Sequence, residues 1–393
     1  MWAMLPASAA LVGLALYARR MQRRRVSRVP EPGLTRAQQI AFESRGYVVV
    51  PGLLGDEDLD PLQEEFEGVL DTICTEAHAR GAIPSTYSQL PFHERYLALC
   101  KATGKLYSDP WRPALPGALH AITERTPCHF GTAVFGLIRN TKLLSAVGSL
   151  IGDEITSNPI QNARIKPPEA CLQSCAAGLG ARGIDAGLVG VTPWHQDNGV
   201  CTADADQTAM VTAWVPLHDV DADNAPLIVL PCSHRWGLQQ HCVSSATKEV
   251  HLPSEAIDRL IAKTGLGALT LPMRRGDVLL LHPRLVHTSA PNRAERVRFS
   301  FDLRYNATGQ PTGRAAFPAF VVRSRSDPAS ECRHHAEWAG AWLAARQRYA
   351  DEAAAARRSS GTEHAQSAPV PVPVSALLGR ERWINHPDAI PCA

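Results

Sequence analysis

Residues 209–230 read AMVTAWVPLHDVDADNAPLIVL and contain the pattern that decides the fold class. The apolar runs Ala209–Leu217 and Pro226–Leu230 are short, and a turn rich in Asp and Asn separates them. Similar runs follow at Gly267–Leu271, Asp277–Leu281 and Val297–Leu303. Short apolar runs between Pro, Gly and Asp turns are typical of an antiparallel sandwich or barrel, whereas a βαβ fold would interleave them with helices. The pattern therefore predicts an all-β core over about residues 154–305.

Helical patterns lie before this core. Residues 35–45 predict a helix, with Thr35 as its N-cap and Gly46 as its stop. The β-branched run Tyr47–Val50 predicts a strand. Residues 55–81 and 132–151 each predict one long helix. The fold class is therefore predicted to be mainly β with flanking helices.

Composition excludes several classes of protein. The chain has 393 residues, of which 45% are hydrophobic and 20% charged, as in ordinary globular proteins. Its formal net charge is only +2, and six arginines between residues 19 and 28 precede the first acid, Glu31. Without them, 34 basic residues face 38 acidic ones. Because nucleic-acid binding needs a strongly basic face, no nucleic-acid partner is expected.

Both ends of the chain differ from the body. Residues 2–17 carry no charge and precede the arginines, so we expect a short membrane anchor with the following domain in the cytosol. A mitochondrial transit peptide is the alternative. The expected organisation is an anchor or targeting segment over 1–30, a main domain over 31–325, and a C-terminal part over 326–393. That last part combines a helix over 335–358, with Trp338, Trp342 and Tyr349 as packing residues, and a Pro-rich tail.

Ten cysteines are scattered along the chain. A secreted disulfide scaffold would be short and dense in Cys, so mostly free thiols are expected. Cys171 and Cys175 form the only close pair, and their spacing is wrong for most structural zinc sites. We interpret them as two thiols in a loop.

Residues 192–199, TPWHQDNG, place His195 two residues before Asp197. On a strand, residues two apart face the same way, so the imidazole and the carboxylate could share one metal ion. A hydrogen-bonded His–Asp pair is the alternative interpretation.

A second segment, RRGDVLLLHPRLVHTSAPN over 274–292, contains His282 and His287. Either could complete a set of two histidines and one carboxylate, which on Fe(II) leaves positions open for a co-substrate and oxygen. Arg298 lies in the apolar run 297–301, where a charge is costly unless paired. Its planar guanidinium would suit a dicarboxylate, and an internal ion pair with Asp302 is the alternative.

Together, TPWHQDNG, TAWVPLHDVDADNAPLIVLPCSHRWG, RRGDVLLLHPRLVHTSAPN and RVRFSFDLRYN resemble the phytanoyl-CoA dioxygenase family in order and spacing. The resemblance runs from about residue 36 to about 325. It implies a double-stranded β-helix (jelly-roll or cupin-like) core with Fe(II), 2-oxoglutarate and molecular oxygen, and ascorbate as reductant. It implies metal ligands at His195, Asp197 and His287, which decides against His282. It also implies that Arg298 and Ser289 bind the distal carboxylate of 2-oxoglutarate, and Trp214, Gln196 and Asn162 are further candidate contacts.

The function that the resemblance implies is oxidation of a substrate C–H bond, with release of succinate and CO2. Hydroxylation is favoured over halogenation because Asp197 is present. The expected substrate is a small molecule or lipid-like, and an N-terminal anchor favours a lipid-like or membrane-delivered one. The insert over 169–190 would lie at the mouth of the core and influence substrate choice. Two alternatives stay open: a zinc hydrolase on the same fold, and a non-catalytic, membrane-tethered metal-binding or scaffold protein.

Overall fold

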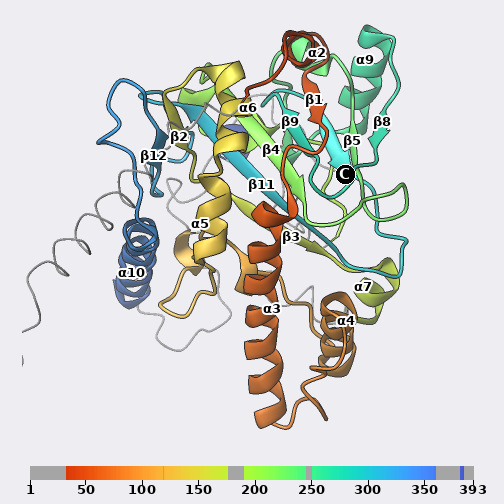
Figure 1. The fold of residues 1–393 in the computed structure, drawn as a ribbon, viewed down its shortest axis with the longest axis vertical. Helices are drawn as coiled ribbons and strands as arrows, with labels where there is room; N and C mark the ends of the chain where they lie inside the picture. Colours follow the sequence, from red (N-terminus) through yellow and green to blue (C-terminus); the bar gives the residue numbers. More distant parts are fainter. Residues whose placement is uncertain (1–31, 118, 176–189, 245–249, 360–380, 385–393) are drawn as a thin grey trace, which may run out of the picture.

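A computed structural model describes residues 32–117, 119–175, 190–244, 250–359 and 381–384 (Figure 1). The expected anchor over residues 2–17, the arginines that follow it, most of the 169–190 insert and the Pro-rich tail lie outside the described residues.

The larger of two facing sheets runs across the middle of the molecule (Figure 1). Its seven strands are antiparallel, and four of them lie in the predicted runs Tyr47–Val50, Ala209–Leu217, Asp277–Leu281 and Val297–Leu303. Along the sheet the order is β1 (Tyr47–Val50), β9 (Val278–Leu281), β4 (Met210–Pro216), β11 (Arg298–Ala307), β2 (Ile155–Ser157) and β12 (Phe320–Arg323), and β3 (Asn162–Lys166) also pairs with β11. β11 extends four residues beyond the predicted run, to Ala307.

A smaller antiparallel sheet packs against the larger one. Its order is β10 (His287–Ser289), β5 (Leu227–Val229) and β8 (Leu269–Leu271), and β6 (Cys242–Val243) pairs with β7 (Val250–His251) nearby. Trp214, Leu279 and Leu281 of the larger sheet share one apolar cluster with Leu227, Val229 and Leu271 of the smaller sheet. Two antiparallel sheets closed around such a cluster form the double-stranded β-helix that the resemblance implies.

Successive side chains of β11 point to opposite faces of the larger sheet. One face packs against the helices, and the other is turned toward the smaller sheet. Phe299, Phe301, Leu303 and Tyr305 belong to the main hydrophobic core with the helices. The alternate residues Arg298, Ser300, Asp302 and Arg304 point the other way, between the sheets. Because buried charges are costly without partners, this polar row marks the place where a site is built.

Most of the described helices pack in the main core on the outer face of the larger sheet, and the sequence explains where the first of them begins and ends. α2 (Arg36–Arg45) begins at a capping box between Thr35 and Gln38 and ends at Gly46, whose φ of 84° is left-handed. α3 (Asp56–Ala79) directs Leu62, Phe66 and Leu70 into the core. The other α-helices among the described residues are α4 (Phe92–Thr103), α5 (Thr132–Ile138), α6 (Thr141–Ile151), α7 (Glu169–Cys175), α9 (Ser254–Thr264), α10 (His335–Ser359) and α11 (Glu381–Ile384). Short 3-10 turns lie at η1 (Asp109–Trp111), η2 (Leu119–Ala121), η4 (Asp197–Val200), η5 (Ala203–Ala205) and η6 (Ser233–Trp236).

The prediction of one helix over 132–151 is wrong. The chain breaks into α5 and α6 at Asn140, whose side chain accepts hydrogen bonds from the backbone N–H groups of Lys142 and Leu143. An Asn cap satisfies the free N–H groups of a new helix start, which explains the break. The run has the length and mean hydropathy (1.2) of a membrane span, but α6 packs against the larger sheet through Leu143, Ala146 and Val147.

Helix α10 of the C-terminal part packs onto the main domain. Trp338, Trp342 and Tyr349 of α10 are buried in the main core, and Trp342 stacks on Phe130.

The loop interpretation of Cys171 and Cys175 is wrong, because both lie on helix α7. Eight cysteines in the described part of the chain are free thiols, and Cys242 is disulfide-bonded.

Candidate active site

Three side chains of the expected ligand types meet between the two sheets. His195 lies beside β10, Asp197 is the first residue of η4, and His287 is the first residue of β10. One possible ligand atom from each lies within 4.8 Å of the others, and all three residues are buried. The two imidazole rings are 4.2 Å apart between centroids. Two imidazoles and one carboxylate at this separation could hold one divalent transition-metal ion.

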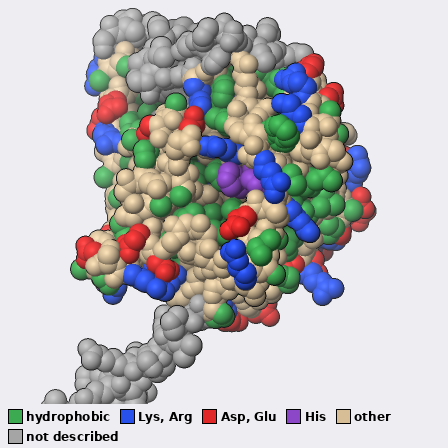
Figure 2. Space-filling view, turned by 90° about the horizontal axis from the view of Figure 1, so that it is seen from above, with side chains coloured by type: hydrophobic (Ala, Val, Ile, Leu, Met, Phe, Trp, Pro, Cys, Tyr) green, Lys and Arg blue, Asp and Glu red, His purple; other side chains and the backbone are tan. Residues whose placement is uncertain are grey.

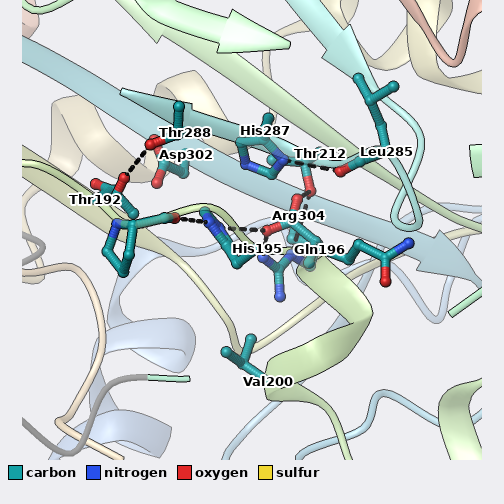
Figure 3. A network of polar contacts seen from close by, with 12 residues as sticks. Thr192, His195, Gln196, Val200, Thr212, Leu285, His287, Thr288, Asp302 and Arg304 are labelled. Carbon is teal, nitrogen blue, oxygen red and sulfur yellow. Dashed lines mark hydrogen bonds and ion pairs between the residues drawn. The ribbon is translucent and has the colours of Figure 1, made fainter. Parts of the chain in front are cut away.

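The backbone fixes which nitrogen of each histidine is free. His195 Nδ1 lies 2.8 Å from the carbonyl oxygen of Pro193, and His287 Nδ1 lies 3.0 Å from that of Leu285. A carbonyl only accepts, so each Nδ1 donates and each Nε2 keeps its lone pair for a ligand (Figure 3). Burial, together with the nearby His287, holds the pKa of His195 well below its usual value, so this imidazole is neutral at pH 7.

Asp197 is held by two partners that the sequence prediction missed. Thr212 donates its hydroxyl to Asp197 Oδ2 at 2.6 Å, and the Arg304 guanidinium pairs with Oδ1. Burial alone would raise the pKa of Asp197, but the Arg304 charge, the two histidines and the Thr212 hydrogen bond outweigh it and hold the pKa below its usual range. The carboxylate is therefore ionised and oriented before any metal arrives.

The sequence contained a signal for Arg304 but not for Thr212. Arg304 lies six residues after Arg298 on β11 and therefore faces the same side. Thr212 lies directly across from Arg304 in the β4–β11 ladder. Strand periodicity would have found Arg304, but the identity of its neighbour on β4 depends on the register, which the sequence alone does not give.

The segment that carries His195 and Asp197 is not the strand that the sequence predicts. His195 makes an isolated bridge to His287, but the chain then turns into η4 at Asp197. His195 Nε2 and Asp197 Oδ1 are nevertheless 3.8 Å apart. The turn occurs because Asn198 and Gly199 take up loop hydrogen bonds, to the carbonyls of Pro283 and Gln196, instead of a ladder.

Gln196 lies between the two ligands, but its amide points away from them (Figure 3). Its Nε2 donates to the carbonyls of Gly237 and Arg284, and its Oε1 accepts from the backbone N–H of Gln239. All three bonds hold loops together, so the structure does not bring this candidate contact to the cavity. Asn162 stands across from Asp302 in the ladder and is not among the cavity-lining residues that the structure describes.

A small cavity lies against the three candidate ligands. Its other walls are Arg164, Thr192, Thr212, Trp214, Leu227, Leu281, Thr288 and Asp302. Arg164 forms an ion pair with Asp302, so the acid that the sequence offered as a partner for Arg298 is engaged elsewhere. The indole Nε1 of Trp214 and the Oδ1 of Asp302 are buried without a hydrogen-bond partner. Unpaired polar atoms on a cavity wall are expected where a ligand supplies the partner.

Arg298 is fully buried and does not itself line the cavity, but its guanidinium carbon lies 5.4 Å from the ring centroid of Trp214, which does. It donates to Ser300 Oγ, and its Nε and Nη2 have no hydrogen-bond partner. Burial lowers the pKa of Arg298 to about 9, so the group remains cationic at pH 7. A buried cation with two free donors fits a carboxylate ligand, such as the distal carboxylate of 2-oxoglutarate.

Ser289 lies two residues after His287 on β10, in contact with a buried lysine that sequence reasoning missed. Lys166 donates to Ser289 Oγ at 2.5 Å and to Thr192 Oγ1 at 3.0 Å, and it is 1% exposed. Lys166 and Arg298 are directly opposed in the β3–β11 ladder, so two cations flank this end of the site.

His282 lies away from the cluster. Its Nδ1 accepts from the backbone N–H of Arg284 at 3.1 Å, and its ring packs against His234 and Phe42. Figure 2 looks down on the molecule from above the view of Figure 1 and shows Lys and Arg side chains around histidines at the centre of that face.

Fold and site together define a class. A double-stranded β-helix that presents two histidines and one carboxylate in a cavity, next to a buried arginine with free donors, is the architecture of non-haem Fe(II), 2-oxoglutarate-dependent oxygenases. The chain belongs to the phytanoyl-CoA dioxygenase (PhyH) family, whose model matches residues 42–300.

Individual relatives are distant. Peroxisomal phytanoyl-CoA dioxygenase of Mus musculus is 21% identical over 280 residues, which is 70% of this chain and 69% of the mouse protein. The match to the Bos taurus protein is 29% identical over 90 residues, and it covers 23% of this chain and about a quarter (26%) of the bovine one. A solved structure, the non-heme α-ketoglutarate-dependent carbocyclase SnoK from nogalamycin biosynthesis, is 15% identical with a TM-score of 0.43. That match covers 75% of this chain and 89% of SnoK.

Proposed function

We propose that this protein is an Fe(II)- and 2-oxoglutarate-dependent dioxygenase that hydroxylates a C–H bond of a small, lipid-like molecule. The observation that carries the proposal is the convergence of His195, Asp197 and His287 in one buried cavity, with donor atoms within 4.8 Å. Bound Fe(II) and 2-oxoglutarate would together supply the oxidation, in which substrate, 2-oxoglutarate and O2 give hydroxylated substrate, succinate and CO2.

Different residues of the site would bind the metal and 2-oxoglutarate. His195, Asp197 and His287 would hold Fe(II) on one face and leave its other positions open. Arg298, with its two free donors, would bind the distal carboxylate of 2-oxoglutarate, and Ser289 lies at the same end of the site beside Lys166. Trp214 would donate its unpaired indole N–H to the same ligand.

The cavity walls would exclude water from the reacting atoms. Leu227, Leu281 and Trp214 form its apolar part, and all three are buried. A dry site strengthens the electrostatic hold of Arg298 and Arg304 on their carboxylates and protects reactive species from side reactions. The free donors of Arg298 favour this function over a zinc hydrolase, because hydrolysis has no need of a second carboxylate ligand.

The decisive experiment measures succinate released from 2-oxoglutarate by the purified protein with Fe(II), ascorbate and oxygen. His287→Ala should abolish turnover, because it removes a ligand, and His282→Ala should keep it, because His282 lies outside the cluster. The His282→Ala variant controls for the loss of an imidazole from the same segment. If the wild-type protein bound neither Fe(II) nor 2-oxoglutarate under anaerobic conditions, the proposal would have to be abandoned.

The lipid-like nature of the substrate and the location of the protein are parts of the same proposal. An uncharged segment over residues 2–17, followed by arginines, supports a membrane anchor with the domain in the cytosol, and a mitochondrial address is the alternative. A fusion of residues 1–30 to a fluorescent reporter should fractionate with membranes. A reporter that stayed soluble would remove this support for a membrane-delivered substrate.

A further inference from the structure

The short helix α11 lies far from the metal ligands in sequence but packs beside them in space. Trp383 is 7% exposed, and its indole Nε1 donates to the carbonyl oxygen of Gly199 at 2.7 Å. Gly199 belongs to η4, the turn that begins with Asp197. The C-terminal segment therefore contacts the loop that carries a candidate metal ligand.

A second contact fixes the far end of the same loop. The Arg382 guanidinium binds both carboxylate oxygens of Asp206, each at 2.8 Å. The two side chains are 18% and 28% exposed, so this bidentate pair is shielded more than an ordinary surface ion pair. The same guanidinium reaches the carbonyl oxygen of Cys201 at 3.4 Å. Trp383 and Arg382 thus hold residues 199–206 at three points.

A third contact reaches the peptide between two ligands. The ring of Trp383 packs against that of His241 at 5.0 Å between centroids. His241 is 1% exposed, and its Nε2 accepts the backbone N–H of Gln196, which lies between His195 and Asp197. A Cβ added at Gly199 would come within 2.5 Å of His241 Nε2, so the loop lies directly on this ring. Moving Trp383 would therefore release His241 and, through it, Gln196.

We propose that α11 is a positioning element of the metal centre: Trp383 and Arg382 fix the 195–206 loop so that Asp197 meets His195 and His287 in ligand geometry. The assignment rests on the proposed function, since it requires that the three residues bind a metal. Neither Trp383 nor Arg382 lines the cavity, so both act through the loop and not on the substrate. Partners that orient ligands from behind commonly change metal affinity by about 10- to 100-fold when they are removed.

The test compares full-length Trp383→Ala, Trp383→Phe and Arg382→Ala with the wild-type protein. Trp383→Phe keeps a ring against His241 and loses only the N–H donor to Gly199. Arg80→Ala, which breaks the exposed Arg80–Glu76 pair at the C-terminal end of α3, is the matched control for the loss of an arginine. Two quantities are measured: the dissociation constant for Co(II) with its visible spectrum, and amide hydrogen exchange over residues 195–206 without metal.

Trp383→Ala should weaken Co(II) binding about 10-fold, alter the Co(II) spectrum and speed exchange in the loop. Trp383→Phe should fall between Trp383→Ala and the wild-type protein, and Arg80→Ala should match the wild type. A Trp383→Ala variant that melts earlier but binds Co(II) with wild-type affinity and spectrum would overturn the assignment, because α11 would then only add stability. Wild-type protein that bound no metal would instead overturn the proposed function, and the assignment with it.

Discussion

Thr212 and Arg304 stand directly opposite each other on β4 and β11, and each binds a different oxygen of Asp197. Arg304 Nε also donates to Thr212 Oγ1 at 3.2 Å, so the three side chains form a closed triangle behind the candidate metal position. Both Asp197 oxygens have partners before a metal binds. The charge and the orientation of the carboxylate ligand are therefore set by neighbours on the larger sheet.

Thr212→Val should weaken metal binding by about 10-fold while leaving the fold intact. The substitution keeps the side-chain shape and removes the donor to Asp197 Oδ2, so the carboxylate gains freedom to rotate. Thr212→Ser keeps the hydroxyl and should retain near wild-type affinity. Titration of both variants with Mn(II) or Co(II) checks the prediction, and equal affinities in the two variants would show that this hydrogen bond does not orient the ligand.

Arg304→Met should destabilise the metal-free protein by about 3–5 kcal/mol, because it leaves the Asp197 charge buried without its cationic partner. Asp197→Asn should also be destabilising, since it leaves the Arg304 cation without its anion. The double variant removes both charges and should lose less than the sum of the two single losses. Urea unfolding of the four proteins measures this coupling, and strictly additive losses would mean that the ion pair contributes nothing to the folded state.

The acid sensitivity of the metal-free protein should come partly from His282. Burial, with help from His234 and Arg284, lowers the pKa of His282 to about 4, against about 6.5 in an unfolded chain. The unfolded state then binds the proton first, so the stability from a neutral His282 is complete above pH 6.5 and is lost as pH falls toward 4. Between pH 6.5 and 5 the loss should be roughly 2 kcal/mol.

His282→Gln should flatten that slope because glutamine does not titrate. The comparison uses the change in unfolding free energy between pH 6.5 and 5, not its absolute value, since the variant also loses ring contacts with Phe42 and His234. Identical slopes in the two proteins would place the acid sensitivity elsewhere, for example at His241, whose pKa burial lowers to about 3.

The parts of the fold that the sequence predicted are those with local signals. β4, β9 and β11 were predictable because turns bound their apolar runs, and α2 because Thr35 and Gly46 mark its ends. The break at Asn140 was missed although Asn is a strong cap, since the apolar run around it reads as continuous.

The parts of the site that the sequence did not predict depend on tertiary register. Nothing local indicates that Arg164 pairs with Asp302, because that contact arises only when β3 and β11 are side by side. The orientation of Gln196 follows from the turn at Asp197, which strand periodicity does not anticipate. The contact of Trp383 with Gly199 joins residues that are 184 apart in sequence, so no local sequence pattern predicts it.

Arg298 should reduce the stability of the metal-free protein while it provides cofactor affinity. Its guanidinium is fully buried, and its Nε and Nη2 have no partner in the absence of a ligand. Because each unsatisfied buried donor is unfavourable, Arg298→Met should raise the free energy of unfolding without ligand by about 1–3 kcal/mol. The same variant should weaken 2-oxoglutarate binding by about 10- to 100-fold, since it loses charge-assisted hydrogen bonds, while Co(II) affinity stays unchanged. Urea unfolding and anaerobic 2-oxoglutarate titration on one preparation measure both effects. A variant that is less stable and still binds 2-oxoglutarate normally would make Arg298 a structural residue and would leave the carboxylate without its proposed partner.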